Sequence, residues 1–465
     1  MSQPQRKTKK TFTYRTAAPR YRGAQSQVPA TTASIPITIA EGARRLVVSA
    51  RYARSRFQGI LLAHGWRFLV FSLLMRLPAA MVMLAIMMML AVQNGEATLG
   101  GYAAGTVGLS SALMIPVYRS ISERWGQRRI FFAVTALNMV ALMWLTTESL
   151  RFSGTSNGSI TRFLVACAVV GVTTVPLGAM MRSYWSAEYL STKDRRKLNA
   201  SISLETMLDV TAIPAGAAIA GMTTVLFTAQ STLFAVILID VLGLIMLLWR
   251  PENLPVETRD TSATERRKPL RGVSRSLLWI PQLGTICLGI SLGATQASIV
   301  SFTMSTDQLG AAGFLIALLG LCAVGAALFV LFERLPMFGW VAWLISGIFL
   351  MMTAMILSLP GSTSGMIPPL IFMGMAYGMC LVTMDSVAAS LSARKNLDLA
   401  LSTLQASSLG GIALGFVWAA DLSGSYSYQV SLIIPLVAAA TFFCLGHLYG
   451  FLWRRSYEEH LALLP

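Results

Sequence analysis

The chain has 465 residues, of which 55% are hydrophobic and only 12% charged, and its formal net charge at pH 7 is +17. Soluble domains carry roughly 25% charged residues, and a mean hydropathy of +0.62 exceeds what a soluble core needs. These values exclude an ordinary soluble globular protein and predict a membrane protein.

The N-terminal segment, residues 1–60, differs from the rest of the chain. It is basic and rich in Gln, Ser, Thr and Pro up to about Pro36, which predicts disorder. Between Ala43 and Leu61, apolar residues recur at helical spacing among five arginines. This pattern favours either a basic amphipathic helix on anionic lipid of the inner leaflet or a solvated tail that only fixes topology.

Twelve apolar runs follow, and each is long enough to cross the roughly 30 Å hydrocarbon layer. They predict an all-α polytopic membrane protein with twelve transmembrane helices in two six-helix bundles, at 61–249 and 277–453, joined by a basic linker at 250–276 and ending in a tail at 454–465. The runs lie at about 66–92, 98–118, 129–148, 161–181, 200–223, 229–249, 277–304, 309–332, 338–358, 366–391, 400–420 and 428–453.

The basic residues predict the orientation of these spans. All but four of the 37 Lys and Arg residues fall in the tails, in the linker or in every second loop. Short cytoplasmic loops hold such an excess, so both termini are expected in the cytoplasm and the protein in the cytoplasmic membrane. The net positive charge then reports topology, and no nucleic-acid partner is expected.

Two features indicate an internal repeat. Glu123-Arg124 follows the second run and Glu333-Arg334 the eighth, and Arg182 follows the fourth run as Arg394 follows the tenth. Two similar six-helix bundles are the arrangement of transporters built from parallel repeats around a central pathway.

The loop at 119–129 is the most specific motif of the chain. Its residues Glu123, Arg124, Gly126, Arg128 and Arg129 resemble the signature G-x-x-x-D-R-x-G-x-[RK]-[RK] of the major facilitator superfamily, with Glu for Asp and Arg119 for the first glycine. The segments at 76–78, 182–186 and 204–209 are similar to those of actinobacterial members. The superfamily's antiporter signature in the fifth helix is absent, since 213–218 reads Ile-Pro-Ala-Gly-Ala-Ala.

The resemblance implies a conformational latch at the cytoplasmic mouth, formed by Glu123, Arg124, Gly126, Arg128 and Arg129 with Arg182. A carboxylate among guanidinium groups can form charge-assisted hydrogen bonds in one conformation and lose them in another. The alternative is that these charges only hold the loop on the cytoplasmic side.

Charged residues within the apolar runs are costly and normally face a cavity or a partner. Arg76 and Asp209 each lie about ten residues from the cytoplasmic start of a run, at a depth of roughly 15 Å, so they can pair. Glu205 and Asp209 are four residues apart and share one helix face. This set predicts a proton-coupling centre, or alternatively a static ion cluster that fixes helix packing.

Two further acids lie in the runs. Asp385 is in the tenth run, which by the family resemblance lines the central cavity, and this implies a contact with substrate or proton. Asp240 lies in the middle of the sixth run, and no role is predicted for it.

No enzyme, cofactor or metal site is expected. The five cysteines fall inside runs without paired spacing, and His64, His447 and His460 lie near the ends of runs or in the tail. Nothing in this pattern combines a nucleophile with a base.

The sequence therefore predicts a secondary active transporter of a small organic solute that works by alternating access as a monomer, is coupled to protons and acts in efflux. Two alternatives stay open. One is a lipid flippase or scramblase on the same fold, and the other is a membrane scaffold or sensor that does not transport.

Overall fold

The computed structural model describes residues 68–94, 97–152, 157–182, 185, 195–249, 275–332, 339–391 and 397–462. These residues are almost entirely α-helical, and no strand occurs among them. The tail at 1–60, most of the linker at 250–276 and the predicted amphipathic helix at 43–61 lie outside the described residues.

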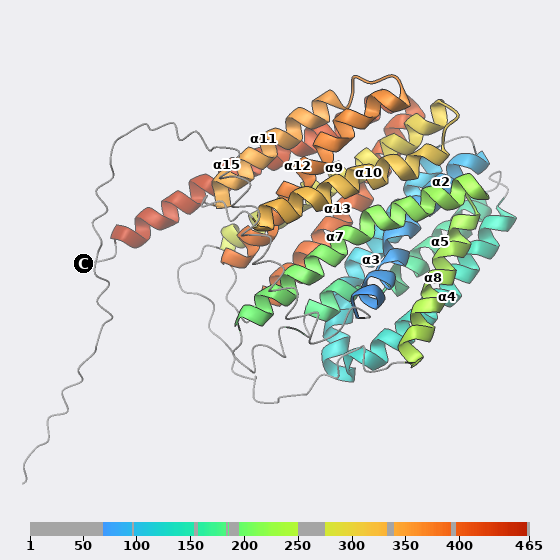
Figure 1. The fold of residues 1–465 in the computed structure, drawn as a ribbon, viewed down its shortest axis with the longest axis horizontal. Helices are drawn as coiled ribbons and strands as arrows, with labels where there is room; N and C mark the ends of the chain where they lie inside the picture. Colours follow the sequence, from blue (N-terminus) through green and yellow to red (C-terminus); the bar gives the residue numbers. More distant parts are fainter. Residues whose placement is uncertain are drawn as a thin grey trace, which may run out of the picture. The chain divides into compact units, whose positions relative to one another are not determined.

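Each apolar run overlaps a helix, and the helices are those labelled in Figure 1. Their bounds are α2 Leu77–Asn94, α3 Ala97–Trp125, α4 Gln127–Arg151, α5 Asn157–Thr173, α7 Arg195–Leu226, α8 Ser231–Trp249, α9 Arg275–Ser305, α10 Gly310–Phe332, α11 Gly339–Ile356, α12 Thr363–Leu391, α13 Leu397–Ser425, α14 Tyr428–Ser431 and α15 Ile433–Ala462.

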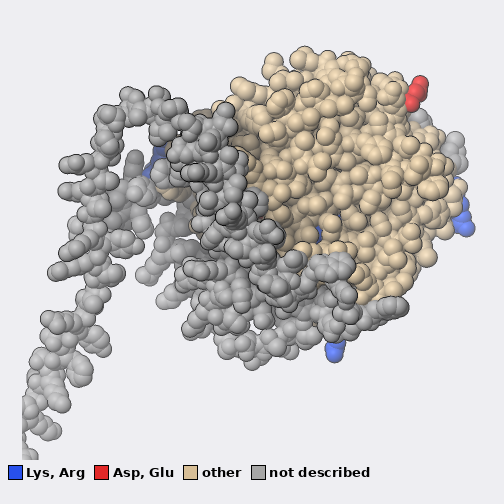
Figure 2. All heavy atoms as spheres, viewed as in Figure 1, with Lys and Arg blue, Asp and Glu red and all other residues tan. Residues whose placement is uncertain are grey.

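Ten helical segments of the described chain are long and apolar enough to cross a membrane. The two that fall short overlap the second and sixth predicted runs. The α3 helix is rich in Gly, Ser and Thr and ends in a polar segment, and the side chains of α8 are described only over Ser231–Met246. Figure 2 shows that the described residues on one face of the molecule include few Lys, Arg, Asp or Glu side chains.

The helices pack into two groups with a shared interface. Within the first group α2 packs on α3, α7 and α8, and within the second α9 packs on α13 and α15. Across the interface α3 contacts α13 and α7 contacts α10, and Figure 1 shows α7 beside α10. The interface therefore joins a helix pair from each half of the chain.

Small residues let the two halves approach closely at one end of this interface, which we name the glycine end (residues 98–105, 217–225, 310–313 and 416–424). The backbones of Gly221 in α7 and Gly313 in α10 are in contact, and a Cβ on Gly101 of α3 would overlap Ala420 of α13. The Tyr102 hydroxyl donates to Asp421 Oδ1 across the same interface at 2.8 Å. The glycine end is thus packed shut.

Two predicted spans are broken rather than continuous. The first turns at residues 75–76 before α2, and the fourth loses its helical conformation at 174–176 after α5. Proline accounts for both breaks, because Pro78 and Pro176 have no N–H to give to the preceding turn and their rings crowd it. Each break turns the chain at the depth where the charged residues of the spans lie.

Candidate functional site

The candidate site is a cluster of charged side chains beside the interface between the two halves. The cluster is built on Arg76, which lies at the break before α2 and pairs with two acids of α7. Arg76 is 5% solvent-exposed and Glu205 is fully buried. A buried charge of this kind is stable only when it is paired and hydrogen-bonded.

Arg76 meets both acids of α7. Its Nη2 forms an ion pair with Glu205 Oε2, and its Nε lies 2.6 Å from Asp209 Oδ1. Its Nη1 donates to the hydroxyl and, at 2.8 Å, to the carbonyl of Ser72 one turn earlier. The guanidinium is therefore fixed by two carboxylates and its own helix.

A second arginine completes the cluster. Arg182 Nη2 lies 3.0 Å from Asp209 Oδ2 and donates to Gln405 Oε1 of α13 at 2.6 Å. Asp209 is thus bracketed by two guanidinium groups, and Arg182 ties the first half of the chain to the second. The Arg182 side chain is buried, so this bridge crosses the interface away from bulk water.

The remaining oxygen of Glu205 also has a donor. Trp185 Nε1 donates to Glu205 Oε1 at 2.8 Å, and the Trp185 ring is fully buried against Phe68. Gly178 provides the space for the neighbouring carboxylate, because a methyl group there would overlap Asp209.

Asp385 of α12 joins the same cluster from the second half of the chain. It hydrogen-bonds Thr206 of α7 and is within electrostatic range of Arg182 and Asp209. Five charged residues from both halves, Arg76, Arg182, Glu205, Asp209 and Asp385, therefore interact. We name them the interface cluster.

The interface cluster contains three acids and two bases, so its formal charge is −1 when every group is ionised. One added proton would make it neutral. Charge inside a membrane is costly, so such a set can take up and release a proton as its partners separate or meet. The alternative is a set of fixed pairs that only holds the helices together.

The predicted latch residues are only partly described. The side chains of Glu123, Arg124 and Arg128 lie outside the described residues, and Arg129 is exposed at the start of α4. Gly126 joins α3 to α4 with φ of 88°, a conformation that favours glycine. Arg182, assigned to the latch from the sequence, contacts Asp209 and Gln405 among the described residues.

Sequence reasoning missed three members of this site. Ser72, Trp185 and Gln405 hydrogen-bond the charged residues. Trp185 stands within a segment that resembles the superfamily, but Ser72 and Gln405 carry no pattern that separates them from other polar residues in a span. Asp240 lies apart from the interface cluster, in a cavity between α4 and α8.

Comparison with known proteins agrees with the fold. The Major Facilitator Superfamily profile matches residues 68–392. The nucleoside transporter NupG has a similar structure, with a TM-score of 0.63 for a mutant at 10% sequence identity, covering 82% of this chain and 98% of NupG. A second NupG structure gives 0.58 at 11% identity, covering 83% and 98%.

The human organic anion transporter MFSD10 gives a TM-score of 0.56 at 16% identity, covering 82% of this chain and 98% of MFSD10. A search of curated protein sequences finds no match. At these identities the solved structures establish the fold alone, whereas the profile match covers more than half of the chain. The chain is a multi-pass membrane protein that belongs to the major facilitator superfamily.

Proposed function

We propose that the protein is a proton-coupled secondary transporter that exports a small organic solute across the cytoplasmic membrane by alternating access between two six-helix bundles. The observation that carries this proposal is the interface cluster. It joins two guanidinium groups of the first half to carboxylates from both halves, at the interface where alternating access would separate them.

The arrangement supports coupling over a static role. A cluster that only fixed packing would gain little from an excess acid, because a buried carboxylate without a counter-charge costs stability. A proton carrier needs an acid whose surroundings change during transport. Asp385 of the second half meets Arg182 and Asp209 of the first, so separation of the halves would change the charges near this carboxylate and with them its affinity for a proton. The structural neighbours are described as nucleoside and organic anion transporters, which supports a small organic solute.

The orientation belongs to the same proposal. The positive-inside rule puts the Arg182 end of the bundles and both termini in the cytoplasm. The glycine end then faces outward, and its close packing makes the described conformation one that is closed to the outside. Twelve spans would follow if α3 and α8 also cross the membrane with their neighbours.

A solute screen on reconstituted vesicles tests the proposal. Purified protein is assayed with nucleosides and organic anions, with and without an imposed pH gradient, beside vesicles without protein. We expect at least one solute to move against its gradient only when the pH gradient is present, with matching proton movement reported by an internal pH dye. Solute transport that ignores the pH gradient would contradict proton coupling, and movement of labelled lipid without solute transport would identify a flippase.

A further inference from the structure

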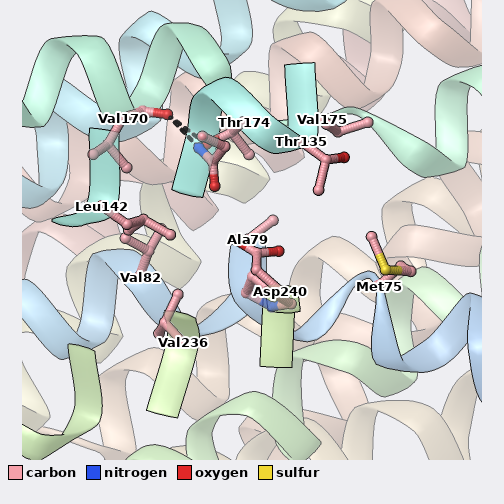
Figure 3. A pocket seen from close by; sticks show the side chains of 12 residues that line it. Met75, Ala79, Val82, Thr135, Leu142, Val170, Thr174, Val175, Val236 and Asp240 are labelled. Carbon is pink, nitrogen blue, oxygen red and sulfur yellow. Dashed lines mark hydrogen bonds between the residues drawn. The ribbon is translucent and has the colours of Figure 1, made fainter. Parts of the chain in front are cut away.

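Asp240 occupies a separate cavity inside the first helix group. The cavity has a volume of about 20 Å³ and is lined by residues of α2, α4, α5 and α8 and of the two helix breaks. This is room for a single water-sized occupant. Figure 3 shows Thr135 and Thr174 on one side of it and Asp240 on the other.

Two buried polar atoms at this cavity lack a partner among the described residues. Asp240 Oδ2 and Thr135 Oγ1 make no hydrogen bond, although Asp240 is only 5% and Thr135 only 1% exposed. An unsatisfied buried oxygen costs about 1–3 kcal/mol, and more if it is charged. Two of them in one cavity point to an occupant that satisfies both.

The lining also shows what kind of occupant would fit. The Asn138 amide nitrogen donates to the Val170 carbonyl at 3.2 Å and to Thr173 Oγ1 at 2.9 Å, and the Thr174 hydroxyl donates to the same carbonyl at 2.8 Å. The donors of Asn138 and Thr174 are thus used within the protein. Apart from the hydroxyl proton of Thr135, what remains for an occupant is oxygen, which suits a hard cation.

The charge at the cavity limits that cation to a single positive charge. Asp240 is the sole charged residue among the twelve that line the cavity. Arg76 follows the lining residue Met75 in the chain, but its guanidinium is paired with Glu205 and Asp209. A monovalent cation would neutralise the site, whereas a divalent one would leave a net charge in the membrane interior.

The two helix breaks lie at the same cavity. Met75 and Pro78 flank the break before α2, and Thr174 and Val175 belong to the break after α5. Because Pro78 has no N–H, the Leu74 carbonyl loses its helical donor. Unwound segments of transporter helices supply such carbonyls to Na⁺.

We propose that Asp240, Thr135, Asn138 and Thr174 form a binding site for one sodium ion within the first helix group, distinct from the interface cluster. The break that lines this site also positions Arg76. Occupancy of the site therefore acts on the geometry of the interface cluster through residues 75 and 76.

Thermal unfolding of the purified full-length protein, followed by tryptophan fluorescence, tests the site. NaCl is titrated against choline chloride at constant ionic strength. We expect a saturable rise in Tm on the order of a few °C with Na⁺, a smaller rise with K⁺, and none with choline. Thr135→Val and Asp240→Asn should each abolish the Na⁺-dependent rise.

The matched controls are Thr146→Val, a buried threonine elsewhere on α4 that bonds only the Leu142 carbonyl, and Asp421→Asn at the glycine end. Both should keep the Na⁺-dependent rise. Identical unfolding of the parent protein in NaCl and choline chloride would overturn the proposal, as would a Na⁺ response that survives in Thr135→Val and Asp240→Asn. A rise that appears only on lowering the pH, in the absence of Na⁺, would assign the carboxylate to a proton and also overturn it.

Discussion

At the scale of single residues, the interface cluster depends on how its two bases pair with its three acids. Arg76 and Arg182 bracket Asp209, and Glu205 is satisfied by Arg76 and Trp185. Every one of these bonds forms in an environment with little water, where an unpaired charge is far more costly than at a surface. Substitution of a single residue of the interface cluster should therefore change the stability of the protein strongly, by an amount that depends on which charged group loses its partner.

Arg76→Ala is the most severe of these changes, because it leaves Glu205 and Asp209 without their shared counter-charge. We expect a loss of about 3–5 kcal/mol in stability, the range for breaking a buried ion pair. Adding Glu205→Gln to Arg76→Ala should restore part of the loss, since it removes one unpaired carboxylate. Thermal unfolding of the parent protein and the two variants in detergent measures both effects, and a double variant no more stable than Arg76→Ala would contradict the charge argument.

Gly178→Ala tests the position of Asp209 without changing any charge. The added methyl would overlap the Asp209 carboxylate, which must then move away from Arg76 and Arg182. We expect transport to slow on the order of 10- to 100-fold, as small misplacements of functional groups do, with the protein still folded. Gly158→Ala, where a methyl meets nothing within 4 Å, is the control, and equal transport by both variants would show that Asp209 needs no fixed position.

The residue scale also shows what the sequence could not provide. Arg76, Glu205, Asp209 and Asp385 stand out because they are charges within apolar runs, and the structure brings all four together. Gln405 could not be found this way, because an uncharged amide within a span has no distinguishing pattern. Arg182 was visible, but its place at the end of a run indicated a loop residue, whereas the structure buries its side chain and bonds it to Asp209 and to Gln405 of the other half.

At the scale of helices, apolar run length predicted the elements well because membrane thickness sets their length. The breaks at 75–76 and 174–176 were not predicted, although Pro78 and Pro176 are signals for them. Proline in a membrane helix leads to a break in some settings and a mild bend in others, depending on whether neighbours satisfy the freed carbonyls. Whether a proline breaks or only bends a helix is therefore decided by the packing of neighbouring helices, which the sequence of the apolar run does not contain.

Packing at the glycine end leads to an element-scale prediction. Leucine at Gly221 would overlap the backbone of Gly313, so it should disfavour the state in which α7 and α10 are in contact by about 1–3 kcal/mol, the usual cost of overpacking. In a variant without native cysteines, Thr98→Cys at this end should then react faster with a membrane-impermeant maleimide. Thr98 lies against α13, so its reactivity reports whether this end is open.

Gly325→Leu is the matched control for Gly221→Leu, because it lies in α10 and a Cβ there meets nothing within 4 Å. It should leave the reactivity of the Thr98→Cys reporter unchanged. Equal reactivity in the Gly221→Leu protein and the parent would mean that this contact does not hold the glycine end shut.

At the scale of the whole molecule, the distribution of basic residues predicts which side each loop occupies. We expect an epitope or cysteine reporter placed at Pro360, or within 154–159, to be accessible from outside intact cells. One placed within 257–271 should become accessible only after permeabilisation. Selective labelling of these positions measures the topology directly, and the reverse pattern would mean that the glycine end faces the cytoplasm.

The account as a whole depends on one statement, that the interface cluster carries the coupling proton. Gradient-driven solute movement and solute exchange, measured in the same vesicles for the parent protein, Glu205→Gln, Asp209→Asn and Asp385→Asn, test it most directly. Glu148→Gln, a carboxylate near the far end of α4, serves as the control. Neutralising the coupling acid should abolish uphill movement and keep exchange, because the empty carrier can no longer reset by losing its proton, and Glu148→Gln should keep both. Full uphill transport with the parent pH dependence in all three cluster variants would contradict the account.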